Sequence, residues 1–152
     1  MDFLQDMIHN PIITATFFAW VIAQLSKTIL HVIITKKFVA ERLVGAGGMP
    51  SSHSATVCAL VTAVGFEYGA GGFEFAAVLV LAMIVMHDAM GVRREAGNQA
   101  RTINEIVEML VKLGDKSPVD EKLKEFVGHT PVQVLAGALI GIATGMVVCG
   151  IM

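Results

Sequence analysis

The stretch Gly47-Gly48-Met49-Pro50-Ser51-Ser52-His53-Ser54-Ala55 decides how the rest of this chain is interpreted. Its two glycines allow backbone conformations that other residues avoid, and the proline then fixes a turn. Ser51 or Ser52 is a natural N-cap for the apolar run that follows. A helix N-terminus that carries unpaired N–H groups, hydroxyls and an imidazole is suited to binding an anion. The alternative is an ordinary turn with a serine cap and an incidental histidine.

The composition is that of a membrane protein. Of the 152 residues, 55% are hydrophobic and only 16% are charged, whereas roughly a quarter of residues are charged in soluble domains. Cys58 and Cys149 lie inside apolar runs, which predicts small buried side chains rather than a disulfide or a metal site. The basic residues flank apolar segments without interleaved aromatics, which argues against nucleic acid as a partner.

Four apolar segments predict an all-α integral-membrane bundle that forms a single domain, residues 1–152. The segments cover residues 12–34, 52–68, 73–90 and 132–152. The first is long enough to cross a hydrocarbon core of about 30 Å. The second is marginal in length, so a re-entrant segment is the alternative there.

Residues 91–131, between the third and fourth segments, contain many charged residues and are not continuously apolar. Apolar residues recur at helical spacing between Ile103 and Val111. A break at residues 114–118 then precedes a short charged stretch at 119–127. We therefore expect a helical hairpin that is soluble or lies at the membrane surface.

The basic residues predict the topology. Apart from Lys27, every lysine and arginine lies in the loop after the first segment or in residues 91–131. With four spans these two regions share one side, which the positive-inside rule makes cytoplasmic. The predicted location is the cell (inner) membrane, with both termini outside and the polar site at the cytoplasmic face.

Lys27 lies on one side of the first segment together with Gln24 and His31. It is about 12 Å along the helix from Thr35, too deep for its ammonium group to reach the interface fully. Ionisable residues at such depth usually face the bundle interior and mark function. Structural pairing with Asp88 or with a backbone carbonyl is the alternative.

Histidines at the same membrane face suit phosphoryl transfer. Cations and N–H groups hold phosphate oxygens, one imidazole attacks phosphorus, and a second protonates the leaving oxygen. The sequence has no evident carboxylate cluster of the kind that holds Mg²⁺, so we predict a route through a phosphohistidine without metal or cofactor. A weaker alternative is a metal site built from His53, His87, Asp88 and His129.

Three motifs follow one another along the chain. They are the stretch 47–55, the run 88–100 with Asn104, and Gly128-His129-Thr130-Pro131-Val132-Gln133-Val134 with Gly137. Together they resemble the divergent branch of the type 2 phosphatidic acid phosphatase family, which is related to acid phosphatases and vanadium-dependent haloperoxidases. The resemblance implies a helical membrane bundle that hydrolyses phosphate monoesters or pyrophosphates, here of a lipid or polyprenyl substrate, without a metal.

The resemblance also implies roles for individual residues. Pro50-Ser51-Ser52-His53 matches the family's P-S-G-H, so Ser51 and Ser52 are expected to bind phosphate and His53 to act as general acid. His129 resembles the nucleophilic histidine. The remaining predicted site residues are Lys27, Arg93 and Arg94 as phosphate-binding cations, Asp88 as the partner of a histidine or arginine, and His87, Gln99, Asn104 and Gln133 as supporting side chains.

The chain departs from the family pattern at three places. Gln133 stands where the wider family has an acidic residue, and an amide cannot stabilise an imidazolium by charge. The family's arginine falls on Leu123, so Arg93 or Arg94 is the expected replacement. The family's K-x6-R-P pattern is absent, and Lys27 is the alternative lysine. These departures keep open a non-catalytic protein that binds or moves phospholipid head groups.

Gly137, Gly141 and Gly145 form a stripe of small residues on the fourth segment. Such a stripe lets two helices approach closely. Packing within the chain and a homodimer interface are the two interpretations.

Overall fold

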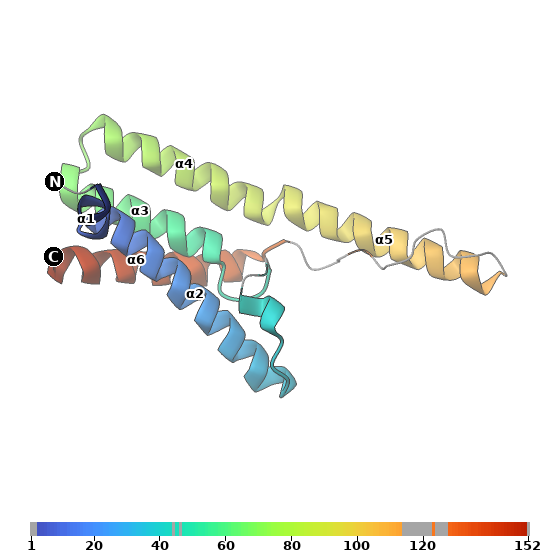
Figure 1. Ribbon diagram of the computed structural model, residues 1–152. Helices are drawn as coiled ribbons and strands as arrows, with labels where there is room; N and C mark the ends of the chain where they lie inside the picture. Colours follow the sequence, from blue (N-terminus) through green and yellow to red (C-terminus); the bar gives the residue numbers. More distant parts are fainter. Residues whose placement is uncertain (1–2, 44, 46, 114–122, 124–127, 152) are drawn as a thin grey trace.

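The computed structural model of the protein describes residues 3–43, 45, 47–113, 123 and 128–151. Within these ranges the regular structure is entirely helical, which confirms the predicted all-α class. In chain order the elements are α1 Phe3–Ile8, α2 Pro11–Thr35, the 3-10 helix η1 Ala40–Leu43, α3 Ser52–Tyr68, α4 Phe73–Met90, α5 Val92–Lys112 and α6 Pro131–Ile151 (Figure 1).

Local sequence explains where the longest helix begins and ends. The side chain of Asn10 caps α2 and accepts hydrogen bonds from the N–H groups of Ile12 at 2.9 Å and Ile13 at 3.2 Å. Pro11 occupies the first position, where its missing N–H costs nothing. Lys36 ends the helix in a left-handed conformation, φ 56°, and donates its N–H back into the last turn.

α3 lies at the centre of the bundle and packs against α2, α4 and α6 (Figure 1). Its contact with α2 consists of small side chains. Ala19 and Ala23 of α2 form a fully buried cluster with Ala55 and Ala59 of α3, and Ile140 of α6 packs against it. Small residues let helix axes come close, which favours association inside a bilayer, where the hydrophobic effect gives little help.

The glycine stripe of α6 packs on α3 of the same chain. A Cβ atom added at Gly137 or Gly141 would collide with a backbone carbonyl group of α3. A Cβ atom at Gly145 would lie 2.8 Å from the Cβ atom of Thr62. Packing within the chain, one of the two interpretations of the stripe, is therefore present. Self-association of the protein stays a prediction.

Among the residues that the structure describes, three helical stretches are long and apolar enough to cross a membrane: α2, the run that begins with α4, and α6. α3 has the predicted bounds, but its 17 residues make it the shortest of the four predicted spans, at about 26 Å. Large apolar side chains are exposed on the outer faces of the other three: Phe17, Phe18, Ile22, Leu25, Ile29 and Ile33 on α2, Val80, Leu81, Met83 and Ile84 on α4, and Leu135, Leu139, Met146 and Val147 on α6. A surface of this kind suits hydrocarbon rather than water.

α5 continues from α4 and projects beyond the bundle (Figure 1). The two helices are separated at Gly91, whose φ of −92° and ψ of −91° are not helical. The apolar periodicity lies between Ile103 and Val111, and α5 begins well before it, at Val92. The preceding run contains alanine, arginine, glutamate and glutamine, all good helix formers. The predicted break at 114–118 and second helix at 119–127 lie outside the described residues, apart from Leu123.

Figure 1 shows the start of α1 and the end of α6 at one end of the bundle, with the regions after α2 and α4 at the other. Both basic regions therefore share one end, as the charge pattern predicts. The N-terminal ends of α3 and α6 lie at that same end and carry the predicted histidines.

Candidate functional site

The candidate site lies where the N-termini of α3 and α6 meet the C-terminus of α4. Two backbone hydrogen bonds join these ends. The N–H of Ser51 donates to the carbonyl oxygen of Gln133 at 3.0 Å. The N–H of His129 donates to the carbonyl oxygen of Ala89 at 3.0 Å. These bonds hold the start of α6 against the two other helix ends.

His53 and His129 are neighbours at this junction. Their ring centroids are 5.7 Å apart and their planes are inclined by 66°, an edge-to-face arrangement. His129 is only 1% exposed, whereas His53 is half-buried. The two histidines that the sequence motifs single out therefore face each other, although they come from helices far apart in the chain.

Gln133 orients the imidazole of His129. Its Oε1 atom lies 3.2 Å from Nδ1 of His129 and accepts the backbone N–H of Thr130 at 3.1 Å. The Thr130 hydroxyl oxygen accepts the N–H of Gln133 at 3.4 Å, which completes a capping box at the start of α6. Because the backbone donor fixes this amide atom as an oxygen, we infer that Nδ1 of His129 carries a proton.

The imidazole of His129 is thus oriented although position 133 carries glutamine and not an acid. The amide performs the orienting function of a carboxylate through geometry, without contributing negative charge. A threonine followed three residues later by glutamine is a capping-box signature, and it could have identified this arrangement from the sequence.

The turn before α3 has the geometry that its glycines predict. Gly47 and Gly48 both have positive φ, 85° and 83°, a region that favours glycine. Ser51 caps the helix, and its Oγ accepts the N–H of Ser54 at 3.4 Å. The first-turn N–H groups have no acceptor within the helix and point out of its end. Both predicted phosphate-binding serines, Ser51 and Ser52, are buried, and Ser51 uses its hydroxyl to cap the helix.

Ser54 was not among the predicted site residues. It is fully buried, and its Oγ has no hydrogen-bond partner in the part of the chain that the structure describes. Its Cβ lies against Gly137 of α6, where an added Cβ would come within 3.1 Å. This buried hydroxyl lies within the contact between α3 and α6.

Lys27 is 3% exposed and lies against the glycine turn. Its Nζ donates to the carbonyl oxygen of Gly45 at 3.2 Å. Its Cγ is 3.4 Å from the position of a Cβ added at Gly48. Gln24 and Thr28 are also buried, so this polar side of α2 faces the bundle. The structural alternative for Lys27, a bond to a backbone carbonyl, is therefore present, and it holds a cation beside the turn that precedes His53.

The C-terminus of α4 contributes the carbonyl group of Ala89 to the site. Asp88 is half-buried and immediately precedes Ala89, whose carbonyl binds His129. His87 is exposed. Arg93 and Arg94 lie in the first turn of α5, and their side chains fall outside what the structure describes.

Asn104 and Gln99 lie along α5 rather than beside the histidines. Asn104 is about 20 Å along the helix from Gly91. Its side chain binds both backbone groups of Leu123, donating to the carbonyl and accepting the N–H, each at 3.0 Å. Gln99 is exposed. The described contacts of Asn104 thus fasten Leu123 to α5.

The described part of the chain offers no set of side chains that could bind a metal ion. There, no three histidine, cysteine, aspartate or glutamate side chains are close enough together to hold a metal ion. The site consists instead of two imidazoles, a helix N-terminus and a buried ammonium group.

Comparison with known proteins gives two matches that cover most of the chain. Residues 8–144 match the divergent PAP2 family. The chain is also 37% identical over 153 residues to YuiD of Bacillus subtilis (strain 168), described as an uncharacterized membrane protein, and the match covers 94% of this chain and 96% of that one. No solved structure matches.

Proposed function

The chain belongs to the divergent PAP2 family, and on this premise we propose that it is a membrane phosphatase acting on a lipid or polyprenyl phosphate or pyrophosphate. One observation carries the proposal: the buried ring of His129 faces His53 and is oriented by Gln133. In the neutral form of this tautomer, Nε2 of His129 is the ring nitrogen that carries the lone pair for attack, and a second imidazole is at hand.

In the first step, Nε2 of His129 attacks phosphorus. A P–N bond forms while the bond to the leaving oxygen breaks, and His53 gives that oxygen its proton. In the second step, water attacks the phosphohistidine and loses a proton to His53, which releases inorganic phosphate and restores His129.

The helix N-terminus supports this chemistry. The first-turn N–H groups of α3 are directed toward the charge on the phosphate oxygens, and in our proposal Lys27, Arg93 and Arg94 bind the same group. Asp88 is positioned to orient a histidine or to pair with an arginine. No metal or cofactor takes part in this route. Because His129 is 1% exposed, the phosphate enters past the half-buried His53.

We also propose that α3 is the fourth membrane span. The four helices then place the regions after α2 and α4 in the cytoplasm. The histidine pair lies at the cytoplasmic face of the inner membrane, where lipid head groups are within reach.

A second candidate is a protein that binds or translocates phospholipids without hydrolysing them. It is favoured by one observation, the neutral amide of Gln133 behind His129. Without a negative charge there, the imidazolium that develops during attack receives less electrostatic stabilisation.

Phosphate release by the detergent-purified protein tests the proposal. The substrates are phosphatidate, phosphatidylglycerol phosphate and a polyprenyl pyrophosphate, each with EDTA. We expect release that survives EDTA, disappears in His129→Ala, and persists in the matched control His9→Ala, whose side chain is exposed. An absence of release from all three, with lipid phosphate still bound, would overturn the phosphatase and favour the second candidate.

A further inference from the structure

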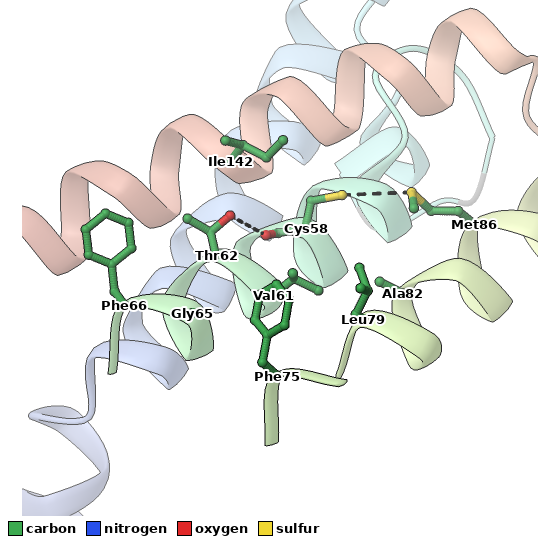
Figure 2. Close-up of a pocket in the computed structure, with 10 residues that line it drawn as sticks. All are labelled: Cys58, Val61, Thr62, Gly65, Phe66, Phe75, Leu79, Ala82, Met86 and Ile142. Atoms are coloured by element: carbon green, nitrogen blue, oxygen red, sulfur yellow. Dashed lines mark hydrogen bonds between the residues drawn. The ribbon is translucent and has the colours of Figure 1, made fainter. Parts of the chain in front are cut away.

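An apolar groove of about 670 Å³ lies between α3, α4 and α6 (Figure 2). Its walls include Cys58 and Phe66 of α3, Phe75, Leu79 and Met86 of α4, and Ile142 of α6. The volume lies within the range of about 300–1,000 Å³ that is typical of small-molecule sites.

Polar atoms in the groove walls contact one another. Figure 2 shows the Thr62 hydroxyl directed at the Cys58 carbonyl, to which it donates at 2.8 Å. The Cys58 sulfur lies 3.8 Å from that of Met86. These contacts leave a surface that is essentially hydrocarbon, so the groove favours an apolar occupant.

One end of the groove adjoins the histidine pair. Cys58 follows His53 by five residues on α3, about 8 Å along the axis. Met86 precedes Ala89, whose carbonyl binds His129, by three residues on α4, about 5 Å. Along both helices the groove therefore begins within about 8 Å of the level of the histidine pair, where the chain of a lipid bound by its head group at that pair would begin.

The groove has the length and opening of a chain-binding site. Cys58 and Phe66 are about 12 Å apart along α3, within one leaflet of a hydrocarbon core about 30 Å thick. Phe66 is 58% exposed and Leu79 is 40% exposed, so the groove opens sideways toward the bilayer.

We propose that this groove binds one hydrocarbon chain of a lipid phosphate whose head group lies beside the His53–His129 pair. The proposal rests on the phosphate site of the proposed function and adds a second binding region to it. The substrate enters laterally from the bilayer, and the side chains of Leu79 and Phe66 limit the chain that fits. Bulk lipid that fills the groove regardless of its head group is the competing occupant.

Photocrosslinking tests this proposal without requiring turnover. The probe is a long-chain alkylphosphonate with a diazirine near the chain end, because its P–C bond is not hydrolysed. The comparison probe has the same chain and a phosphocholine head group. We expect the phosphonate to label peptides of α3 and α4 that line the groove, in competition with unlabelled alkylphosphonate, and the phosphocholine probe to label them far less.

Filling the groove gives a second measurement. Leu79→Trp places a large ring in the groove, and we expect labelling to fall by roughly tenfold or more. Leu81→Trp is the matched control, because Leu81 is on the same helix, is 47% exposed and is not part of the groove wall. It should leave labelling unchanged. Thermal unfolding of both variants establishes that they fold.

The outcomes separate this proposal from the phosphatase. Labelling that is independent of the head group, or equal in the two tryptophan variants, overturns the groove as a substrate site even if phosphate is released. Head-group-dependent labelling in a protein that releases no phosphate supports the groove and overturns the phosphatase. The wild-type competition result stands even if Leu79→Trp does not fold.

Discussion

Replacing Gln133 separates the geometric role of this residue from an electrostatic one. In Gln133→Ala, the Nδ1–H of His129 loses its acceptor while the ring stays 1% exposed. An unsatisfied buried donor costs about 1–3 kcal/mol, and loss of the hydrogen bond from the Thr130 N–H to the Gln133 side chain adds about 1 kcal/mol, while the Thr130 hydroxyl still caps α6. We therefore expect the free energy of unfolding to fall by about 2–4 kcal/mol.

Gln133→Glu keeps both acceptor bonds and adds a negative charge. Charge at a helix N-terminus is favourable by about 0.3–1 kcal/mol, so this variant should unfold no more easily than the wild type. The carboxylate also stabilises the imidazolium that forms when His129 attacks phosphorus. About 1.4 kcal/mol of such stabilisation corresponds to a tenfold faster reaction, so we expect phosphate release to rise by roughly tenfold.

The assay pairs denaturant unfolding in detergent, followed by circular dichroism, with phosphate release at a fixed substrate concentration. Gln99→Ala is the matched control, because it truncates an exposed glutamine of α5. It should change stability by less than about 0.5 kcal/mol. A Gln133→Ala protein as stable as this control would refute the orienting role of the amide. A folded but slower Gln133→Glu protein would refute the electrostatic reasoning.

Three further predictions concern the bundle and its extension. Gly141→Ala should lower the free energy of unfolding by about 1–3 kcal/mol, because the new Cβ collides with α3. The control Gly150→Ala meets nothing within 4 Å and should stabilise α6 slightly. Equal thermal midpoints for the two variants would contradict the packing. Ser51→Ala should lower the free energy of unfolding by about 1 kcal/mol through loss of the helix cap. Ser54→Ala should lower it less, since the Ser54 Oγ has no hydrogen-bond partner among the described residues. Thermal unfolding followed by circular dichroism ranks the two variants, and the reverse order would be incompatible with these roles. Asn104→Ala should speed hydrogen exchange at the Leu123 amide that it binds, measured by mass spectrometry, and unchanged exchange would show that this bond does not protect that amide.

The helices of the bundle were predictable because their signals are local. The bounds of α3 and α4 coincide with the apolar runs at 52–68 and 73–90, since serine or glycine turns precede each run. The predicted hairpin region, residues 91–131, contains α5, but the residue at which this helix begins was not predicted. Hydrophobic periodicity marks only helices that bury a face, whereas the first half of α5 is polar and is helical through its residue propensities.

The candidate site was predictable only in part. Topology alone places His53 and His129 at one end of the bundle, and their rings do face each other. The backbone hydrogen bonds that hold these helix ends together, such as that from the N–H of His129 to the carbonyl of Ala89, could not be predicted from the sequence, because any residue can form them. One partner of Lys27, the carbonyl of Gly45, is likewise a backbone group. Asn104 was assigned to the site from its motif, whereas its bonds to Leu123 reflect a contact that no periodicity reveals.

The capping box explains why an amide suffices at position 133 for the fold. One oxygen with two lone pairs accepts both the N–H of Thr130 and the Nδ1–H of His129. A carboxylate oxygen has the same capacity, so exchanging acid for amide preserves the helix cap and the tautomer of His129 together. Only the charge behind the imidazole differs. The difference between a phosphatase and a lipid-binding protein at this site therefore reduces to one electrostatic term, and that term is what Gln133→Glu restores.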